Sequence, residues 1–154
     1  MEDSGAQVHV RKAGEADIPA LCDLLALLFI QEADFTPDAV RQMRGLRLII
    51  RRPEVGHIFC AVAGDDIVGM VSLLFTVSTA EGGRAAWLED MVVHPVRRGR
   101  GIGEQLLREA IKDARASGCS RITLLTDGSN GSAQRFYERA GFVRSQMVPF
   151  RLSL

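Results

Sequence analysis

The spacing of apolar residues along the first third of the chain predicts one short strand and two helices. Apolar and polar residues alternate over residues 8–11, as they do in a half-buried strand. Residues 17–29 carry apolar side chains at helical spacing, and the same spacing returns in residues 36–52. The dipeptide Thr36-Pro37 is typical of an N-cap followed by proline at the first helical position. Four arginines fall on one side of the second helix, where a solvated face is expected: Arg41, Arg44, Arg47 and Arg51.

The rest of the chain switches between strand and helix patterns. Three consecutive strands joined by turns are expected at residues 57–63, 67–77 and 85–93. They are followed by an amphipathic helix at 102–116, a buried strand at 122–125, a short helix at 132–140 and a last strand at 142–152. The order β-α-α-β-β-β-α-β-α-β predicts one α/β domain over residues 1–154, with a sheet of mixed direction. Only the central β-α-β unit needs to be parallel, with a right-handed crossover.

Composition and charge argue against several classes of protein. Of the 154 residues, 47% are hydrophobic and 25% are charged, which is typical of a folded domain rather than a disordered chain. The 19 basic and 19 acidic side chains leave no net charge, so no nucleic-acid partner is expected. The cysteines and histidines lack the spacing of metal ligands, so no metal is expected. The chain has neither a signal peptide nor an apolar run of about 18 residues, so no membrane partner and a cytoplasmic location are expected.

A segment rich in glycine and arginine connects the strand at 85–93 to the helix at 102–116. A helix N-terminus offers unpaired backbone N–H groups and a partial positive charge, both of which attract phosphate. Glycines let the backbone approach an anion, and arginines add positive charge beside it. The residues concerned are Gly99, Gly101 and Gly103, together with Arg97, Arg98 and Arg100. The segment therefore predicts a binding loop for a pyrophosphate group.

The spacing within this loop separates several kinds of phosphate-binding protein. A Walker A loop requires Gly-Lys-Ser/Thr, which this chain lacks. A dinucleotide fingerprint that starts at Gly99 would place its third glycine at Glu104. Two interpretations remain: a pyrophosphate loop of the form Arg98-x-x-Gly101-x-Gly103, or a glycine-rich turn with solvated arginines.

A second motif lies farther along the chain, and together the two resemble one enzyme family. The second motif is Asn130-x-x-Ala133-x-x-Phe136-Tyr137-Glu138-Arg139-x-Gly141-Phe142, and it follows the strand after the loop helix. With the loop and the strand Trp87–Pro95, it resembles the GCN5-related N-acetyltransferase (GNAT) family over roughly residues 58–150. The resemblance implies a GNAT-like mixed sheet and an N-acetyltransferase that uses acetyl-CoA as its co-substrate.

The resemblance also implies roles for individual residues in binding acetyl-CoA. A backbone N–H within Met91, Val92 and Val93 would polarise the thioester carbonyl, as an oxyanion hole does. The pyrophosphate would lie on the loop residues Arg98, Gly99, Arg100, Gly101, Ile102 and Gly103. Asn130 would contact the pantetheine arm or order a water near it, and Ala133 belongs to the same cofactor-binding set.

Two side chains are expected to move protons in such an enzyme. Tyr137, the only tyrosine, would protonate the leaving thiolate, although a Phe-Tyr pair on an amphipathic helix also suits a core. Glu89 would act as the general base through a water, provided that it is shielded from solvent; an ion-paired or edge carboxylate is the alternative. Because side chains alternate along a strand, Asp90 is expected on the opposite face and is the weaker candidate.

The acceptor is an amine that the sequence does not identify. In the family, the loop between the first two helices borders the acceptor site, and here it carries Glu32, Asp34 and Asp38. Acids in a loop are also common as solvated groups. The alternative function is a catalytically silent coenzyme-A-binding sensor or interaction module. A homodimer is common in the family, and no local feature of the sequence decides the assembly.

Overall fold

The computed structural model describes residues 7–31 and 37–154 of the chain. Its elements are β1 (Val8–Lys12), the 3₁₀ helix η1 (Glu15–Asp17), α1 (Ile18–Gln31), α2 (Ala39–Ile50), β2 (Gly56–Ala63), β3 (Asp66–Ser78), β4 (Gly83–Val93), the 3₁₀ helix η2 (Pro95–Arg97), α3 (Ile102–Ala116), β5 (Ile122–Leu124) and α4 (Gly131–Arg139). The chain divides into two compact units, Met1–Leu124 and Leu125–Leu154, with the sheet in the first unit and α4 in the second.

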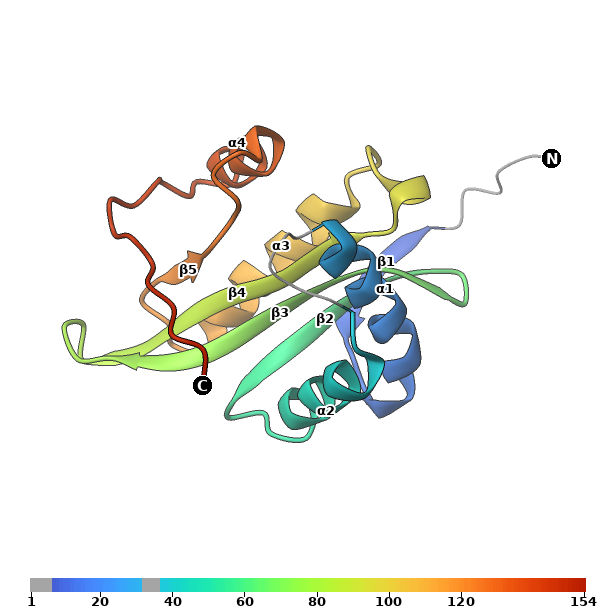
Figure 1. Cartoon of the computed structure of the whole chain (residues 1–154), viewed down its shortest axis with the longest axis horizontal. Coiled ribbons are helices and arrows are strands. Elements are labelled where there is room, and N and C mark those ends of the chain that lie inside the picture. The colour runs from blue at the N-terminus through green and yellow to red at the C-terminus, as the bar shows by residue number, and fades with distance from the viewer. Residues whose placement is uncertain (1–6, 32–36) are drawn as a thin grey trace. The chain divides into compact units, whose positions relative to one another are not determined.

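The first unit contains a five-stranded sheet in the order β1-β2-β3-β4-β5 (Figure 1). Strands β1 to β4 run antiparallel to their neighbours, whereas β5 lies parallel to β4. Antiparallel neighbours can be joined by short turns, but a parallel pair requires a crossover connection, which α3 provides here. The α/β class and the mixed sheet predicted from the sequence are confirmed.

Helices cover both faces of this sheet because its central strands are apolar on both sides. Cys60 of β2 and Met70 of β3 are fully buried in one core together with Leu21 of α1 and Leu46 of α2. Leu73 of β3 lies on the other face and packs with α3. Successive side chains of a strand point to opposite faces, so α1 and α2 cover one face and α3 covers the other.

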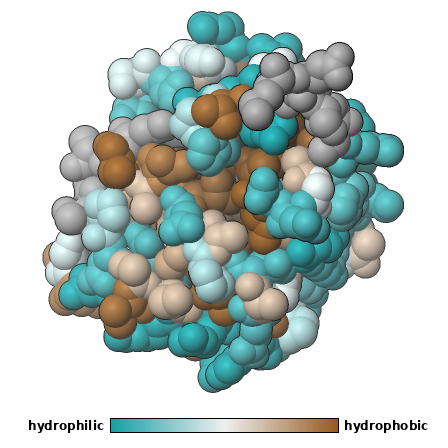
Figure 2. All heavy atoms as spheres, turned by 90° about the vertical axis from the view of Figure 1, so that its right-hand side faces the viewer, coloured by the Kyte–Doolittle hydropathy of each residue, from teal (hydrophilic) through white to brown (hydrophobic). Residues whose placement is uncertain are grey.

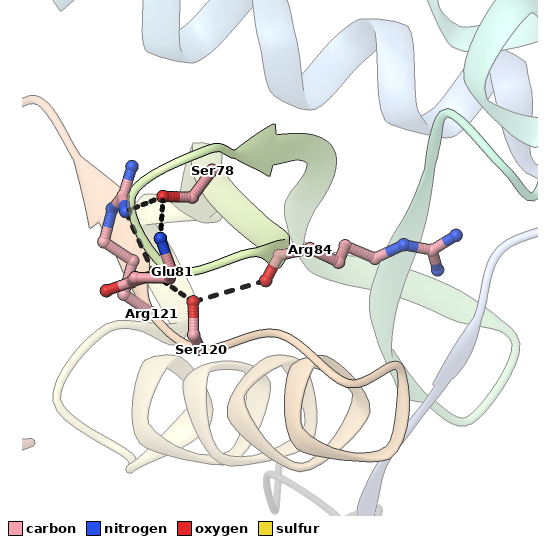
Figure 3. Close-up of polar contacts among 5 residues, drawn as sticks. All are labelled: Ser78, Glu81, Arg84, Ser120 and Arg121. Atoms are coloured by element: carbon pink, nitrogen blue, oxygen red, sulfur yellow. Dashed lines mark hydrogen bonds and ion pairs between the residues drawn. The ribbon is translucent and has the colours of Figure 1, made fainter.

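A network of polar contacts holds the start of β5 beside the hairpin of β3 and β4 (Figure 3). The Arg121 Nη1 atom lies 3.1 Å from both Ser78 Oγ and Glu81 Oε2. The Ser120 hydroxyl donates a hydrogen bond to Glu81, and the Ser120 backbone N–H donates to the Arg84 carbonyl at 2.9 Å. These contacts place the segment before β5 against the first half of β4, so the parallel pairing begins there.

Gly69 of β3 allows α3 to lie close to the sheet. A Cβ atom at this position would meet Leu106 Cδ1 at 3.0 Å and the Val92 carbonyl oxygen at 3.2 Å. It would also lie 3.5 Å from Ile102 Cγ2, in the first turn of α3. The close approach therefore sets the N-terminus of α3 beside the second half of β4.

Gly69→Ala is expected to lower the free energy of unfolding by about 1–3 kcal/mol, because it overpacks a filled core. Urea unfolding measures this loss. Gly83→Ala is the matched control, since Gly83 also lies in a strand but an added carbon there meets no atom within 4 Å. Equal losses in the two variants would contradict the close contact between α3 and the sheet.

The predicted start of one helix and one predicted strand are wrong. Helix α2 begins at Ala39, and its N-cap is Asp38, whose carboxylate accepts a hydrogen bond from the Arg41 backbone N–H at 3.1 Å. The predicted cap, Thr36, lies outside the described residues. The last strand, predicted at 142–152, does not form: these residues are neither helix nor strand, and an apolar pattern alone does not supply the neighbouring strand that backbone hydrogen bonds require.

Candidate functional site

The predicted phosphate loop ends in an open helix N-terminus. Gly99 and Gly101 both have φ of 75°, and Gly101 is the N-cap of α3. The first hydrogen bond of the helix runs from the Gln105 N–H to the Gly101 carbonyl at 3.2 Å, so the N–H groups of residues 102–104 precede the intrahelical ladder. An added Cβ at Gly99 or Gly101 would meet no atom within 4 Å, which leaves space for an anion at this end of the helix.

Buried side chains hold this helix end in place. The face of α3 that packs on the sheet consists of Ile102, Leu106, Leu107, Ala110 and Ala114, all buried. The first of them directly follows the glycine N-cap, so the N–H groups of the first turn cannot move away from the sheet without exposing this core. Gly103 lies in that same first turn.

The loop arginines lie close to the end of β4. The Arg98 side chain donates a hydrogen bond from Nε to the Val93 carbonyl at 3.2 Å, which folds the loop back onto the last residue of the strand. Arg98 and Arg100 are exposed, and Arg97 is half-buried. Arginine side chains are therefore present at the loop, as predicted, and Arg98 also fixes the loop backbone against the end of β4.

The second half of β4 has an open edge. Strand β5 pairs with β4 only from Ala86 to Leu88, whereas β4 continues to Val93. Among the described residues, no strand pairs with residues 89–93 on the β5 side. Unpaired backbone groups on a strand edge can bind an extended molecule by main-chain hydrogen bonds. Met91, Val92 and Val93, predicted to bind the cofactor, belong to this stretch of β4, and the backbone groups of alternate residues face its open side.

A β-bulge interrupts the pairing of β3 and β4 at the same place. Strand β3 has one residue, Val71, between two paired positions where β4 has two, Asp90 and Met91. Asp90 has φ of 53°, and it is the only non-glycine residue with a positive φ among residues 7–31 and 37–154. Such a conformation costs about 1–3 kcal/mol and is found where the surrounding structure imposes it, often at functional sites.

The prediction that Asp90 points away from the Glu89 face is wrong. Ser72 is the register partner of Glu89, so these two side chains share a face of the sheet. The Ser72 hydroxyl donates a hydrogen bond to Asp90 Oδ2 at 3.3 Å, which places the Asp90 carboxylate on that face as well. The bulge is the reason, because its left-handed residue breaks the alternation of side chains along the strand.

Glu89, the predicted general base, has an exposed side chain in this structure. The sequence-based argument required that the carboxylate be shielded from water, and the described residues do not provide that shielding. Asp90 is half-buried by comparison. The catalytic role of Glu89 remains a prediction.

The second unit contains the predicted acid and the residues of the second motif. Asn130 is the N-cap of α4, and its Oδ1 accepts a hydrogen bond from the Ala133 backbone N–H at 3.0 Å. The Tyr137 ring makes edge-on contacts with Phe136 and Phe142, with centroid distances of 5.0 and 5.8 Å. Burial raises the pKa of Tyr137 to about 12, so the phenol keeps its proton at neutral pH. The role of Tyr137 as the acid remains a prediction.

The predicted acceptor region is only partly described. Asp38 serves as the helix cap, and Glu32 and Asp34 lie outside the described residues. The face of the molecule in Figure 2 is mostly hydrophilic, with apolar residues gathered near its centre. Helices α1 and α2 expose the apolar side chains of Ile30, Val40 and Leu48, at 73%, 69% and 49%.

Two arginines of the row at 41, 44, 47 and 51 form ordinary surface ion pairs. Arg51 lies 2.7 Å from Glu15, and Arg41 lies 3.4 Å from Asp38. All four arginines of the row are exposed, as the sequence predicted for a solvated face. Pairs of this kind are weak, so they decorate the helix rather than form an anion site.

The sequence did not predict a role for Ser72 or Gly69, and it named Asp90 only as a weaker candidate base on the opposite face. A serine in the middle of an apolar strand was the available signal, because a buried hydroxyl needs a hydrogen-bond partner. Within residues 7–31 and 37–154, no group of three or more histidine, cysteine, aspartate or glutamate residues is arranged to hold a metal ion. The same residues include no helix that is long and apolar enough to cross a membrane.

Comparison with known proteins shows which family the fold and the loop define. Residues 18–142 match the Acetyltransferase (GNAT) family. Aminoalkylphosphonate N-acetyltransferase of Salmonella typhimurium is 31% identical over 144 residues, which cover 94% of this chain and 90% of that enzyme. Glucosamine 6-phosphate N-acetyltransferase of Trypanosoma brucei brucei is 38% identical over 101 residues, covering 65% of this chain and 66% of that enzyme. The chain belongs to the GNAT family of acetyltransferases.

A solved structure shows the same fold. A predicted acetyltransferase from Clostridium acetobutylicum, solved with acetyl-CoA, has a TM-score of 0.80 over 94% of this chain and 96% of its own, at 18% identity. The likeness at this identity concerns the fold alone. Since the relatives are N-acetyltransferases, the enzyme class predicted from the sequence is confirmed at the level of the family.

Proposed function

We propose that this protein transfers an acetyl group from acetyl-CoA directly to a primary amine, with both substrates bound in one ternary complex. The observation that carries the proposal is the continuity of the open edge of β4 with the open N-terminus of α3. The edge at residues 89–93 leads within one short loop to the free N–H groups of residues 102–104. An extended arm can pair with the strand edge, and a pyrophosphate at its end can bind the N–H groups of the helix.

The residues of the chain supply binding and polarisation. Acetyl-CoA, when bound, supplies an acetyl group activated as a thioester. Backbone N–H groups within Met91–Val93 pair with the pantetheine arm and polarise the carbonyl. The residues Arg98–Gly103 hold the pyrophosphate through backbone N–H groups and positive charge. Asn130 and Ala133 contribute to binding of the pantetheine arm.

Two residues move the protons in this proposal. The amine loses a proton before its nitrogen attacks the carbonyl carbon, and Glu89 accepts that proton through a water. The carbon–sulfur bond then breaks, Tyr137 donates its phenolic proton to the thiolate, and the second proton lost by the nitrogen as it becomes an amide restores the phenol. Burial raises the pKa of Tyr137 to about 12, so the phenol carries at neutral pH the proton that a donor requires.

The acceptor is a small-molecule or peptide amine. Two of the relatives are named for glucosamine 6-phosphate and for aminoalkylphosphonate, each of which has an amine and an acidic phosphorus group. We therefore place glucosamine 6-phosphate and 2-aminoethylphosphonate first in a panel that also contains polyamines, amino acids and peptides with free N-termini.

Release of free thiol from acetyl-CoA in the presence of each amine tests the proposal. We expect thiol release that depends on the amine, with one acetyl group appearing on nitrogen for each thiol formed. A reaction without amine is the control for hydrolysis. Tight binding of acetyl-CoA with no transfer to any amine would instead support the silent coenzyme-A-binding module, and absence of binding would contradict both functions.

Glu89→Gln is expected to flatten the acid limb of the profile of kcat/KM against pH, because it removes the group that accepts the proton of the amine. The profile is measured with the best amine from the panel. Glu54→Gln is the matched control, since Glu54 is also exposed but lies outside the proposed site. A Glu89→Gln profile that keeps the same acid limb would show that water or another group accepts the proton.

A further inference from the structure

Strand β3 carries a buried serine behind the open edge of β4. Ser72 is fully buried, and its strand neighbours Met70, Val71 and Leu73 are fully buried apolar residues. A buried hydroxyl in such surroundings needs a hydrogen-bond partner. Its partner is the carboxylate of Asp90, at 3.3 Å from Ser72 Oγ.

Asp90 occupies the left-handed position of the bulge. Glycine is the usual residue at such a position, and aspartate and asparagine are the side-chain-bearing residues that tolerate it best. An aspartate there has a second property that glycine lacks, because its carboxylate can be tied to a neighbouring strand. Ser72 provides that tie from β3.

The bulge determines which way the following residues of β4 face. Glu89 pairs with Ser72, and the next paired residue of β4, Val92, pairs with Met70. Between these two pairs β4 contains one residue more than β3. Without the extra residue, the pairing register would shift by one and every later side chain and N–H group would turn to the other side. Met91–Val93, on which the proposed polarisation of the thioester depends, would all be affected.

We propose that Ser72 is a positioning residue for acetyl transfer: through its hydrogen bond it holds Asp90 in the left-handed bulge, and so orients the backbone N–H groups of Met91–Val93. This inference rests on the proposed function, because it assigns the orientation to the polarisation of a bound thioester. Ser72 itself does not touch the reacting atoms. The carboxylate of Asp90 acts in this proposal as the acceptor of the hydrogen bond from Ser72.

Substitutions of Ser72 and Asp90 distinguish the effect of the hydrogen bond from the effect of the carboxylate charge. Ser72→Ala removes the hydrogen bond from β3 that helps to hold Asp90 in the bulge, so we expect kcat to fall about 10-fold, less than the 10²–10³-fold typical of losing an oxyanion donor outright. Asp90→Gly removes the charge but adopts a positive φ freely, and Asp90→Asn keeps both the conformation and a hydrogen-bond acceptor. Both should retain most of the turnover. Asp90→Ala neither tolerates a positive φ well nor offers a side-chain acceptor, so its kcat should fall at least as far as that of Ser72→Ala.

The double variant Ser72→Ala, Asp90→Gly is the decisive one. A glycine bulge needs no tether, so the second substitution should restore the kcat that the first removes. Ser78→Ala is the matched control, because Ser78 is a second buried serine of β3 that bonds to Arg121 and lies at the far end of the strand. It should alter stability without altering kcat.

A spectroscopic measurement distinguishes orientation from simple loss of structure. The infrared carbonyl stretch of carbon-13-labelled acetyl-CoA should move to lower frequency on binding to the unmodified protein, as a hydrogen-bonded carbonyl does. The shift should shrink in Ser72→Ala and return in the double variant, while acetyl-CoA affinity stays within about threefold, or less than 1 kcal/mol.

Several results would overturn the inference. A Ser72→Ala variant with unchanged kcat and an unchanged carbonyl shift would exclude a positioning role. Equal losses in Asp90→Gly, Asp90→Asn and Asp90→Ala would show that the charge of Asp90, and not the bulge, is what the reaction needs. Acetyl-CoA that binds and reacts normally in every variant would leave the proposed function intact and defeat only this inference, whereas absence of binding in the unmodified protein would defeat the proposed function itself.

Discussion

Tyr137→Phe is expected to lower kcat about 100-fold, in the range typical of lost proton transfer by a positioned side chain. The substitution removes only the hydroxyl, so the ring can keep its edge-on contacts with Phe136 and Phe142. Affinity for acetyl-CoA should stay nearly the same. Rapid-mixing measurement of the first turnover gives the chemical step, and calorimetry gives the affinity.

A second variant tests whether the packing of the Tyr137 ring, rather than its hydroxyl, affects the reaction. Phe136→Leu changes the neighbour of the same ring and keeps the hydroxyl of Tyr137, so it should alter stability more than the chemical step. If Tyr137→Phe has the turnover of the unmodified protein, the tyrosine belongs to the core of its unit, and the thiolate receives its proton from water.

The raised pKa of Tyr137 also predicts how the free energy of unfolding changes at high pH. The pKa of Tyr137 is about 12 in the folded protein, above its ordinary value of about 10 in an unfolded chain. Between these values the unfolded chain has lost the proton and the folded chain has kept it, so ionisation favours unfolding as the pH rises. The free energy of unfolding should therefore fall more steeply above pH 10 in the unmodified protein than in Tyr137→Phe.

Gly101→Val is expected to lower acetyl-CoA affinity by a factor of ten or more, or about 1.4 kcal/mol. Gly101 is the N-cap of α3 and has φ of 75°, a conformation that a β-branched residue rarely adopts. The structure leaves space around it, so the added side chain lies where the pyrophosphate is proposed to bind. Calorimetric titration with acetyl-CoA measures the loss, and Gly103→Val is expected to act in the same direction.

Gly118→Val is the matched control for this prediction. Gly118 follows the other end of the same helix, has φ of 77°, and also has no atom within 4 Å of an added carbon. Both valines should therefore destabilise the fold by a similar amount, on the order of 1–2 kcal/mol for the left-handed conformation. If the two variants lose acetyl-CoA affinity equally, strain in α3 explains the effect and the pyrophosphate loop is assigned to the wrong place.

The sequence by itself determined the elements that depend on local interactions. The hydrophobic period marks α3, and the glycines before it mark an N-terminus without side-chain crowding; both properties arise within a few residues of one another. The cap of α4 by Asn130 is also local, since the hydrogen bond reaches Ala133 three residues later, although the sequence predicted only cofactor binding for Asn130. The amphipathic period of a helix follows from chain geometry alone, so a single sequence is enough to predict it, whereas the exact cap residue was predicted wrongly for α2.

Only the tertiary structure decided the features that depend on pairing between distant residues. Alternation along β4 placed Asp90 on the wrong face, because the bulge arises from its register with β3, and the tie to Ser72 joins residues 18 positions apart. The apolar pattern at 142–152 likewise suits a strand, but the backbone hydrogen bonds of a strand come from another strand and not from its own sequence. The open edge of β4 has the same origin, since it exists only because β5 ends its pairing at Leu88.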